Sequence, residues 1–428
     1  MFDMVVNISS RPLYGTVKAV PSKSELHRLL ICATLSKSDT LIYANINTTH
    51  LSDDIASTIE CLTALGAVIL LTDGVINVSP PKEFTSHANL QCGESGSTLR
   101  FLLPVAAALS TDAAFHGKGR LPDRPVGHLR NLLASHGCAF SSDTLPFIVS
   151  GNLHGGDFVL PGSVSSQYVS GLLFALPLLA ADSYICIDGT LESRPYLDMT
   201  LESLRLFGIV VNETTDGFFV PGGQIYTSPV TIHAFGDWSN AAFWLTAGAV
   251  GGDIICEGLS LESIQGDRSV LSLLERFGAD VIADNAVHVR KNKLSGQIID
   301  AVNIPDLVPI LSVIASVCEG ETVFTGVARL RIKESDRLVS TANFINNLGG
   351  EAYVYTDGSG ECLRIVGRSA LSGGTVDGCN DHRIVMAAAI ASSVCNGNVI
   401  INGAEAVNKS YPDFFNDFAA LGGSFTIL

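Results

Sequence analysis

The chain has 428 residues, of which 47% are hydrophobic and only 16% are charged, and 41 are glycine. This composition excludes a disordered chain, and the length suits two or three domains. Lys and Arg number 26 against 42 Asp and Glu, which gives a net charge of −16. We therefore expect neither nucleic acid nor a membrane surface as a partner, and any anionic ligand must meet a local cluster of cations.

The sequence is typical of a cytoplasmic protein without disulfides or bound metal. The apolar run at residues 172–181 is too short to span a membrane, and Met1-Phe2-Asp3-Met4 does not resemble a signal peptide. The ten cysteines include no Cys-x-x-Cys pair, so we expect buried, reduced thiols and no metal site. No glycine-rich nucleotide motif is present, so no cofactor is expected.

Taken in chain order, the predicted elements repeat six times. Amphipathic stretches end in a glycine that lies 71, 71, 70, 71 and 73 residues after the previous one. Strand-like residues follow each glycine, as expected where a left-handed residue ends a helix. These glycines are Gly66, Gly137, Gly208, Gly278, Gly349 and Gly422.

A second set of helices is apolar on all sides, which predicts that they are buried. These helices are expected at residues 24–35, 97–109, 167–180, 239–250, 307–317 and 383–394. A strand-like run follows each of them and ends in a turn at Asn45, Gly117, Gly189, Gly258, Gly326 or Gly403. The repeating unit is therefore roughly β-α-β-α-β-β, which predicts an α/β fold with its helices inside.

The repeat also predicts the domain organisation. If the first unit starts at Lys23, the sixth lacks about 20 residues, which is the length that precedes Lys23. We therefore expect strands near residues 4–8 and 15–20 to complete the last unit and close the chain on itself. Six repeats are too many residues to share one hydrophobic core. We therefore predict one domain from 1–20 plus 236–428 and a second from 21–235, with three repeats each.

Polar residues gather where the buried helices begin, and helix N-termini are ready anion sites. Ser, Asp and Asn at these positions are equally typical of helix caps, but caps do not explain the cations. Lys23, Arg28, Arg100 and Arg383 lie in or beside nearly apolar helices, where an unpaired charge is costly. A bound phosphate or carboxylate would neutralise these four charges.

A second group of cations follows the strand-end turns at equivalent points of the repeats. It consists of Arg120, Arg124, Arg194, Arg268, Arg329, Arg331, Lys333, Arg337 and Lys409. Charges scattered over a solvated surface would not recur at equivalent positions of the repeat, so the pattern predicts an anion-binding surface. Asp306 and Glu334 are candidate acid–base groups close to these cations, although Glu334 would also suit a simple ion pair.

Short motifs follow one another along the whole chain. They are Lys23-Ser24 with Arg28, Gly96, Asp123-Arg124-Pro125, Ser165-Ser166-Gln167, Ser193-Arg194-Pro195-Tyr196, Lys333-Glu334-Ser335-Asp336-Arg337, Asp381-His382-Arg383 and Lys409 before Pro412-Asp413. In this order, they resemble the motifs of the 5-enolpyruvylshikimate-3-phosphate synthase family. The resemblance implies a two-domain inverse β/α barrel of six βαβαββ repeats, with the active site in the cleft between the domains.

The resemblance also implies a transferase of the shikimate pathway, and so of aromatic amino-acid biosynthesis. The enolpyruvyl group of phosphoenolpyruvate would pass to the 5-hydroxyl of shikimate 3-phosphate, with release of phosphate through a tetrahedral intermediate. Glu334 would handle the proton at C3, and Asp306 would orient and deprotonate the hydroxyl. Lys23 would act as cation and acid at the bridging oxygen, with His382 assisting. A monomer is expected.

Further residues are assigned by the same resemblance. Those for shikimate 3-phosphate are Lys23, Ser24, Arg28, Ser165, Ser166, Gln167, Ser193, Tyr196, Asp306, Arg329 and Lys333. Those for phosphoenolpyruvate are Lys23, Gly96, Arg124, Gln167, Glu334, Arg337, Arg383 and Lys409.

The sequence departs from the family pattern at two places and leaves two alternatives. Arg329 stands where many members carry Asn, and Glu94-Ser95-Gly96-Ser97 replaces Asn-Ala-Gly-Thr, which leaves glyphosate sensitivity open. One alternative is the sister transferase that acts on UDP-N-acetylglucosamine through a loop cysteine, but residues 116–124 contain none. The other is a non-catalytic anion-binding protein, which would not need Glu334 and Asp306.

Overall fold

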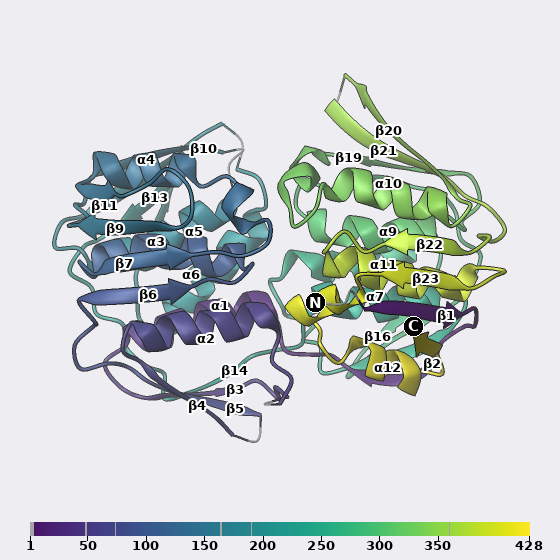
Figure 1. The fold of residues 1–428 in the computed structure, drawn as a ribbon, viewed down its shortest axis with the longest axis horizontal. Helices are drawn as coiled ribbons and strands as arrows, with labels where there is room; N and C mark the ends of the chain where they lie inside the picture. The colour runs from purple at the N-terminus through teal and green to yellow at the C-terminus, as the bar shows by residue number, and fades with distance from the viewer. Residues whose placement is uncertain (1–3, 48, 73, 163–164, 190, 359) are drawn as a thin grey trace. The chain divides into compact units, whose positions relative to one another are not determined.

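The computed structural model describes residues 4–47, 49–72, 74–162, 165–189, 191–358 and 360–428. The chain divides into two compact units, each with a hydrophobic core of its own. Unit 1 comprises Met1–Ser22 and Phe235–Leu428, and unit 2 comprises Lys23–Ala234. The sequence placed the corresponding boundaries after residues 20 and 235. Each unit contains three four-stranded sheets within the described residues (Figure 1).

Unit 2 is built from three βαβαββ sets, of which the first takes its leading strand, β14, from the end of the unit's sequence. Its sheets have the strand orders β14-β3-β5-β4, β6-β7-β9-β8 and β10-β11-β13-β12, and in each the first two strands are parallel and the other pairs antiparallel. The elements are α1 (Lys23–Leu35), β3 (Thr40–Tyr43), α2 (Asp53–Ala64), β4 (Val68–Thr72), β5 (Val75–Ser79), β6 (His87–Gln91), α3 (Gly96–Ala108), β7 (Asp112–His116), η1 (Leu121–Asp123), α4 (Gly127–Ser135), β8 (Cys138–Phe140), β9 (Phe147–Gly151), β10 (Asp157–Pro161), α5 (Ser166–Ala175), η2 (Leu176–Leu178), β11 (Ser183–Asp188), α6 (Arg194–Leu206), β12 (Asn212–Thr214), β13 (Gly217–Val220) and β14 (Thr231–His233).

Unit 1 repeats the same arrangement. Its sheets have the strand orders β22-β23-β1-β24, β18-β19-β21-β20 and β16-β17-β15-β2. The elements are β1 (Val5–Ser9), β2 (Tyr14–Lys18), α7 (Trp238–Val250), β15 (Asp253–Glu257), η3 (Gly266–Ser269), α8 (Val270–Phe277), β16 (Asp280–Ala283), β17 (Val287–Arg290), β18 (Ile298–Asp300), η4 (Pro305–Leu307), α9 (Val308–Ala315), β19 (Glu321–Thr325), η5 (Ala328–Ile332), α10 (Arg337–Asn347), β20 (Glu351–Asp357), β21 (Gly360–Val366), β22 (Gly374–Asp377), α11 (His382–Ala391), η6 (Ser392–Val394), β23 (Val399–Asn402), η7 (Ala404–Lys409), α12 (Phe414–Ala420) and β24 (Ser424–Ile427).

The N-terminal strands close unit 1, but only one of them completes the last repeat. Strand β1 lies between β23 and β24 in the last repeat's sheet, where Figure 1 shows its purple arrow beside yellow β23. Strand β2 instead pairs in parallel with β15 and is the first strand of the repeat that contains α7. The sequence prediction was therefore wrong for β2. The cause is that unit 2 is inserted between this strand and its own helix, so their pairing is not local in sequence.

The six apolar helices are buried, as predicted. Helices α1, α3 and α5 lie in the core of unit 2, and α7, α9 and α11 in that of unit 1. Helix α5 ends at Ala175 and gives way to the 3-10 turn η2, whereas the sequence predicted a helix up to residue 180. The helix ends early because Pro177 has no N–H for a helical hydrogen bond. In the described residues, we find no helix with the length and apolar character that a membrane span requires.

The six glycines that end the outer helices have the expected left-handed backbone. Their φ angles lie between 76° at Gly208 and 109° at Gly66, a region that costs other residues strain. Five of the six strand-end turn residues also have positive φ; the exception is Gly117, where the left-handed residue of the turn is Gly119. None of the ten cysteines, all of which lie in the described residues, forms a disulfide, and eight of them are buried.

Candidate active site

In unit 1, one carboxylate faces three cations at the start of a buried helix. Asp306 lies in η4, directly before α9. Its Oδ1 lies 3.1 Å from Lys333 Nζ and 2.8 Å from Arg337 NH1, and its Oδ2 lies 3.2 Å from Arg383 NH2. The Arg337 and Arg383 side chains are 2% and 6% exposed, so these charges interact with little solvent screening.

The charges in this cluster shift one another's pKa. Burial by itself would raise the pKa of Asp306, but Arg383, Lys333 and Arg337 outweigh burial and hold it well below the ordinary value. Burial lowers the pKa of Lys333 to about 8, with Asp306 opposing the shift. In the absence of substrate, Asp306 is therefore a firmly ionised group and a weak base.

A second carboxylate, Glu334, lies in the same cluster. Its Oε2 lies 2.7 Å from Nδ1 of His382, the first residue of α11, so the ring N–H donates to an ionised Glu334. Its Oε1 lies 3.8 Å from Arg337 NH2. Arg337 is in turn held by Asp381, which accepts from Nε at 2.9 Å and from NH2 at 3.0 Å. The side chains of Glu334 and Asp306 thus share Arg337 as a neighbour.

Two other predicted residues of unit 1, Lys409 and Arg329, lie in the 3-10 helices η7 and η5. Lys409, at the end of η7, is buried and donates from Nζ to the carbonyl oxygen of Asn380 at 2.6 Å. Asn380 directly precedes Asp381, which caps α11 by accepting from the backbone N–H of Arg383 at 3.0 Å. Lys409 therefore stabilises the segment that leads into α11. Arg329 lies in η5, four residues before Lys333.

In unit 2, Lys23 and Arg28 both lie on α1 and have separate partners. Lys23 Nζ lies 2.7 Å from Asp54 Oδ2 on α2. Arg28 donates from Nε to Thr200 Oγ1 at 2.9 Å, from NH2 to the carbonyl of Tyr196 at 2.8 Å, and also to the carbonyl of Ser24. Burial lowers the pKa of Arg28 to about 10, so the side chain stays charged at neutral pH.

The first turns of α3 and α5 are joined by side-chain hydrogen bonds. Gln167 accepts from Arg100 NH1 at 2.7 Å and donates to Ser97 Oγ at 2.8 Å. Gly96 is the first residue of α3, and a Cβ there would lie 2.7 Å from NH1 of Arg124 and 2.8 Å from NH1 of Arg100. Glycine therefore allows two guanidinium groups to approach this helix N-terminus closely.

The predicted serines lie where α5 and α6 begin. Ser165 caps α5 by accepting from the backbone N–H of Gln167 at 3.3 Å, and Ser166 is the buried first residue of that helix. Ser193 precedes α6 in a left-handed conformation, with φ of 56°, and is also buried. Tyr196, in the first turn of α6, supplies the carbonyl that holds Arg28.

The sequence assigned no role to a buried polar network near the start of α7. Asp267 accepts a hydrogen bond from Ser239, and Gln265 donates from Nε2 to Asp237 and to Ser239, both at 2.9 Å. Burial and the charge of Asp306 raise the pKa of Asp267 to about 6, against the opposing effect of Arg383. The Asp237-Trp238-Ser239 helix start was a visible signal, but Gln265 and Asp267 lie in a separate segment.

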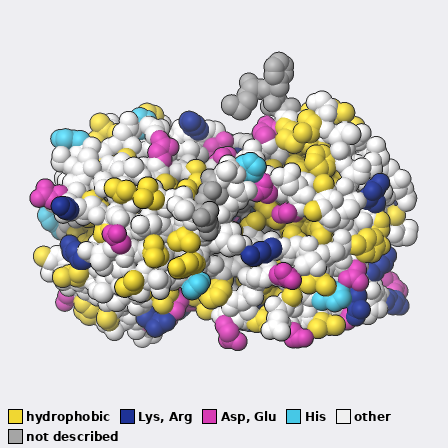
Figure 2. All heavy atoms as spheres, turned by 90° about the horizontal axis from the view of Figure 1, so that it is seen from below, with side chains coloured by type: hydrophobic (Ala, Val, Ile, Leu, Met, Phe, Trp, Pro, Cys, Tyr) yellow, Lys and Arg dark blue, Asp and Glu magenta, His cyan; other side chains and the backbone are white. Residues whose placement is uncertain are grey.

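The repeat-phased cations include three that bind the unit's own oxygen atoms. Arg194 pairs with Asp198 and Glu213, Arg331 pairs with Glu361 and Asp336, and Arg268 donates to the carbonyl of Leu261. Lys333, Arg337 and Lys409 also have protein partners, so phase in the repeat does not by itself separate ligand-binding cations from structural ones. On the face drawn in Figure 2, the visible Lys and Arg side chains are interspersed with Asp and Glu.

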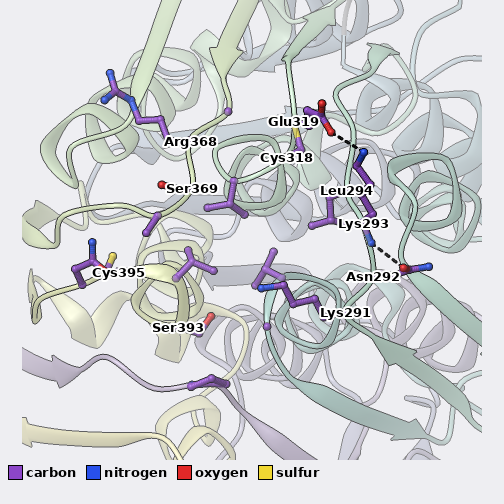
Figure 3. A pocket seen from close by; sticks show the side chains of 18 of the residues that line it. Lys291, Asn292, Lys293, Leu294, Cys318, Glu319, Arg368, Ser369, Ser393 and Cys395 are labelled. Atoms are coloured by element: carbon purple, nitrogen blue, oxygen red, sulfur yellow. Dashed lines mark hydrogen bonds and ion pairs between the residues drawn. The ribbon is translucent and has the colours of Figure 1, made fainter.

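Two other features could hold a ligand. Glu334, Asp381 and His382 bring three possible metal-ligand atoms within 4.8 Å of one another, but the guanidinium of Arg337 already provides a cation to both carboxylates. A pocket of about 710 Å³ in unit 1 lies at the carboxyl ends of the buried helices (Figure 3). Asp306, His382 and Arg383 lie instead where the buried helices α9 and α11 begin.

The position of the pocket explains why cationic side chains line it. Residues Val250 and Gly251 end α7, Cys318 follows α9, and Ser393 lies in η6 after α11. Lys293, which also lines the pocket, lies 3.0 Å from Glu319, as Figure 3 shows. Cations complement the partial negative charge at the carboxyl ends of helices. The cations that line this pocket are therefore explained without an anionic ligand.

The fold defines an α/β protein built from repeats. Cations lie near the starts of buried helices in both units, an arrangement that suits anionic substrates. A family model for EPSP synthase (3-phosphoshikimate 1-carboxyvinyltransferase) matches residues 8–418. The chain belongs to this family.

Named relatives agree with that membership, and solved structures agree with the fold. The 3-phosphoshikimate 1-carboxyvinyltransferases of Clostridium kluyveri and Clostridium acetobutylicum are each 41% identical, over 98% of this chain and 97% of theirs. An EPSP synthase structure from Acinetobacter baumannii has a TM-score of 0.81 at 23% identity, covering 99% of this chain and 100% of that one. The enolpyruvyl transferase NikO from Streptomyces tendae has a TM-score of 0.76 at 16% identity, covering 100% and 99%. The predicted fold class is confirmed.

Proposed function

We propose that the chain transfers the enolpyruvyl group of phosphoenolpyruvate to the 5-hydroxyl of shikimate 3-phosphate and releases phosphate. This is the 3-phosphoshikimate 1-carboxyvinyltransferase activity of its family, which belongs to aromatic amino-acid biosynthesis. We also propose that the enzyme is a cytoplasmic monomer, and light scattering of the purified protein tests the oligomeric state. The relatives favour this activity over transfer to UDP-N-acetylglucosamine and over a non-catalytic role.

The observation that carries the proposal is the Asp306 cluster. Two carboxylates, Asp306 and Glu334, lie with the cations of Lys333, Arg337 and Arg383 in one part of unit 1. Phosphate and carboxylate groups of the substrates match these cations, since Arg binds such oxygens with paired hydrogen bonds. The reaction needs separate groups for the proton at C3 and for the hydroxyl, and the two carboxylates supply them.

The same cluster provides a way to activate the base. Substrate anions that bind Lys333, Arg337 and Arg383 would neutralise the charges that keep the pKa of Asp306 low. The effect of burial would then dominate and raise that pKa, which makes Asp306 a stronger base toward the 5-hydroxyl. Asp306 would therefore gain basicity only when substrate is present.

Glu334 is the proposed group at C3 of phosphoenolpyruvate. It would give a proton to the methylene carbon, so that C2 becomes electrophilic and accepts the hydroxyl oxygen. It would then remove a proton from the resulting methyl group as phosphate leaves. The hydrogen bond from His382 stabilises the ionised form of Glu334 between these steps.

The remaining assigned residues are proposed to bind and orient the substrates. Lys23, held by Asp54, would contact the bridging oxygen and could protonate it as phosphate departs. The assigned residues of unit 2 for shikimate 3-phosphate are Ser24, Arg28, Ser165, Ser166, Gln167, Ser193 and Tyr196, and those of unit 1 are Arg329 and Lys333. The remaining phosphoenolpyruvate residues are Gly96, Arg124 and Lys409.

Phosphate release by the purified protein tests the proposal. We expect release when shikimate 3-phosphate and phosphoenolpyruvate are supplied together, and none when either is omitted. UDP-N-acetylglucosamine in place of shikimate 3-phosphate should give no release. Release with the UDP-sugar, or binding of both proposed substrates without turnover, would overturn the assignment.

A further inference from the structure

A buried chain of hydrogen bonds links the first three helices of unit 2. His27 Nδ1 on α1 lies 2.8 Å from Thr58 Oγ1 on α2, which lies 2.6 Å from Thr98 Oγ1 on α3. Thr98 Oγ1 lies 2.7 Å from Oγ of Ser95, the cap of that helix. None of the four residues is more than 1% exposed. None is assigned to a substrate above.

The protons in this chain run in one direction. The Thr98 hydroxyl donates to Ser95, so its oxygen is the acceptor for Thr58. The Thr58 hydroxyl has then used its only proton, and it accepts from the Nδ1–H of His27. His27 therefore carries a proton on Nδ1. Burial and the charges of Lys23 and Arg28 lower the pKa of His27 well below its usual value, which favours the neutral ring with this proton alone.

The chain begins and ends beside residues proposed to bind phosphoenolpyruvate. His27 lies one helical turn after Lys23, and Ser95 directly precedes Gly96. The ion pair between Lys23 and Asp54 also joins α1 to α2, one turn before the contact between His27 and Thr58. Two contacts one helical turn apart therefore hold α1 against α2. Thr58, which makes one of them, also contacts Thr98 and so links both helices to α3.

A different set of contacts holds the other side of α1. Arg28 binds Thr200 and the carbonyl of Tyr196, both on α6. Arg28 and Tyr196 are residues proposed to bind shikimate 3-phosphate. The contacts are thus separate: α6 supports Arg28, which is assigned to shikimate 3-phosphate alone. Thr58 links the segments that carry Lys23, which is assigned to both substrates, and Gly96, which is assigned to phosphoenolpyruvate alone.

We propose that Thr58 is a positioning residue for phosphoenolpyruvate. Its hydroxyl holds the starts of α1 and α3 in the register that places Lys23 and Gly96 for the same substrate. This inference rests on the proposed function. It predicts that breaking the chain at Thr58 weakens the use of phosphoenolpyruvate and largely spares that of shikimate 3-phosphate. The reason is that Gly96 is assigned to phosphoenolpyruvate alone, whereas Lys23 keeps Asp54 and Arg28 keeps its partners on α6.

Steady-state kinetics of matched variants test this role. Thr58→Val keeps the shape of the side chain and removes the hydroxyl, and Thr58→Ser restores the hydroxyl. We expect Thr58→Val to raise KM for phosphoenolpyruvate about tenfold, since small misplacements of binding groups have effects of this size or larger. KM for shikimate 3-phosphate should stay within about twofold, and Thr58→Ser should behave as the wild type.

The matched control is Thr34→Val on α1, the helix that carries His27. Thr34 is buried in the same core, and its Oγ1 has no hydrogen-bond partner among the described residues. Its replacement should leave the KM of either substrate unchanged. If Thr58→Val does not fold, Ser95→Ala removes the last link of the chain and should show the same selective rise in KM.

The outcomes separate the two proposals. A wild-type enzyme that turns over, with both KM values unchanged or equally raised in the Thr58→Val or Ser95→Ala enzyme, would overturn the positioning role alone. A lower melting temperature with unchanged KM values would assign Thr58 to stability only and would also overturn it. A wild-type protein without turnover would contradict the proposed function, and this inference with it.

Discussion

Glu334 and His382 are joined by a hydrogen bond of 2.7 Å between Oε2 and Nδ1. The two residues are 48 positions apart in sequence and meet because Glu334 precedes α10 while His382 opens α11. The contact leaves Glu334 next to Arg337 and close to Asp306. These contacts hold in place the carboxylate that we propose to transfer the proton at C3.

Glu334→Gln should keep substrate binding and reduce kcat by roughly 10²-fold or more, because the amide cannot transfer the proton at C3. Single-turnover kinetics and calorimetric binding measure these two effects separately. The matched control is Glu361→Gln, which loses the partner of Arg331 in the same unit. The control should keep kcat within about twofold. Equal losses in the two variants would remove Glu334 from its role.

The pKa of Lys333 predicts an alkaline limit for the use of shikimate 3-phosphate. Since burial lowers this pKa to about 8, the ammonium loses its charge as pH rises through that value. The value of kcat/KM for shikimate 3-phosphate reports the free enzyme and should therefore decline above about pH 8. Lys333→Arg keeps its charge and should shift this decline to higher pH. An identical pH profile for the two enzymes would exclude Lys333 as its cause.

Asp267 should make the stability of unit 1 dependent on pH. Its pKa is raised to about 6 in the fold, so the folded state retains a proton that the unfolded chain releases near pH 4. The stabilising contribution is complete below the unfolded value and is lost as pH rises through about 6. Asp267→Asn should therefore be more stable than the wild type at pH 8, by up to roughly 3 kcal/mol.

Urea denaturation at pH 4.5 and pH 8 measures this effect. The advantage of Asp267→Asn over the wild type should be small at the lower pH and larger at the higher one, because the asparagine does not ionise. Ser239 can still donate to the amide oxygen, so its hydrogen bond is preserved. The same difference between the two proteins at both pH values would show that Asp267 has no raised pKa.

Gly96→Ala should interfere with phosphoenolpyruvate in particular. The added Cβ would lie 2.7 Å from Arg124 and 2.8 Å from Arg100, so both guanidinium groups must move. We expect KM for phosphoenolpyruvate to rise by about tenfold and KM for shikimate 3-phosphate to change much less. Gly127→Ala at the start of α4 is the control, since its Cβ would meet nothing within 4 Å. Equal kinetics in the two variants would contradict the role of Gly96.

Much of the fold could be predicted because its signals are local. Each outer helix ends at a glycine with positive φ, and that requirement recurs with the repeat. The placement of β2 could not be predicted in this way. Its partner β15 begins 239 residues after β2 begins, as the pairing of Tyr14 with Asp253 shows. The local sequence of a strand does not specify so distant a neighbour.

The candidate site was predictable to the extent that its residues form motifs. Lys333, Glu334 and Arg337 lie in one short segment, so their clustering followed from the sequence. The partners that set their chemistry did not, because Asp54, Thr58 and Asp267 are single residues in unremarkable segments. Their roles depend on which side chains the helices bring within hydrogen-bond distance.

The central claim is that the chain joins the two substrates by protonating C3 of phosphoenolpyruvate and then removing a proton from the same carbon. Running the reaction in D₂O and recording the proton NMR spectrum of the product tests this directly. Because the intermediate carries a methyl group at C3, the account predicts enolpyruvyl product with deuterium in its vinyl methylene, together with free phosphate. A product without deuterium, or no product from the two substrates, would contradict it.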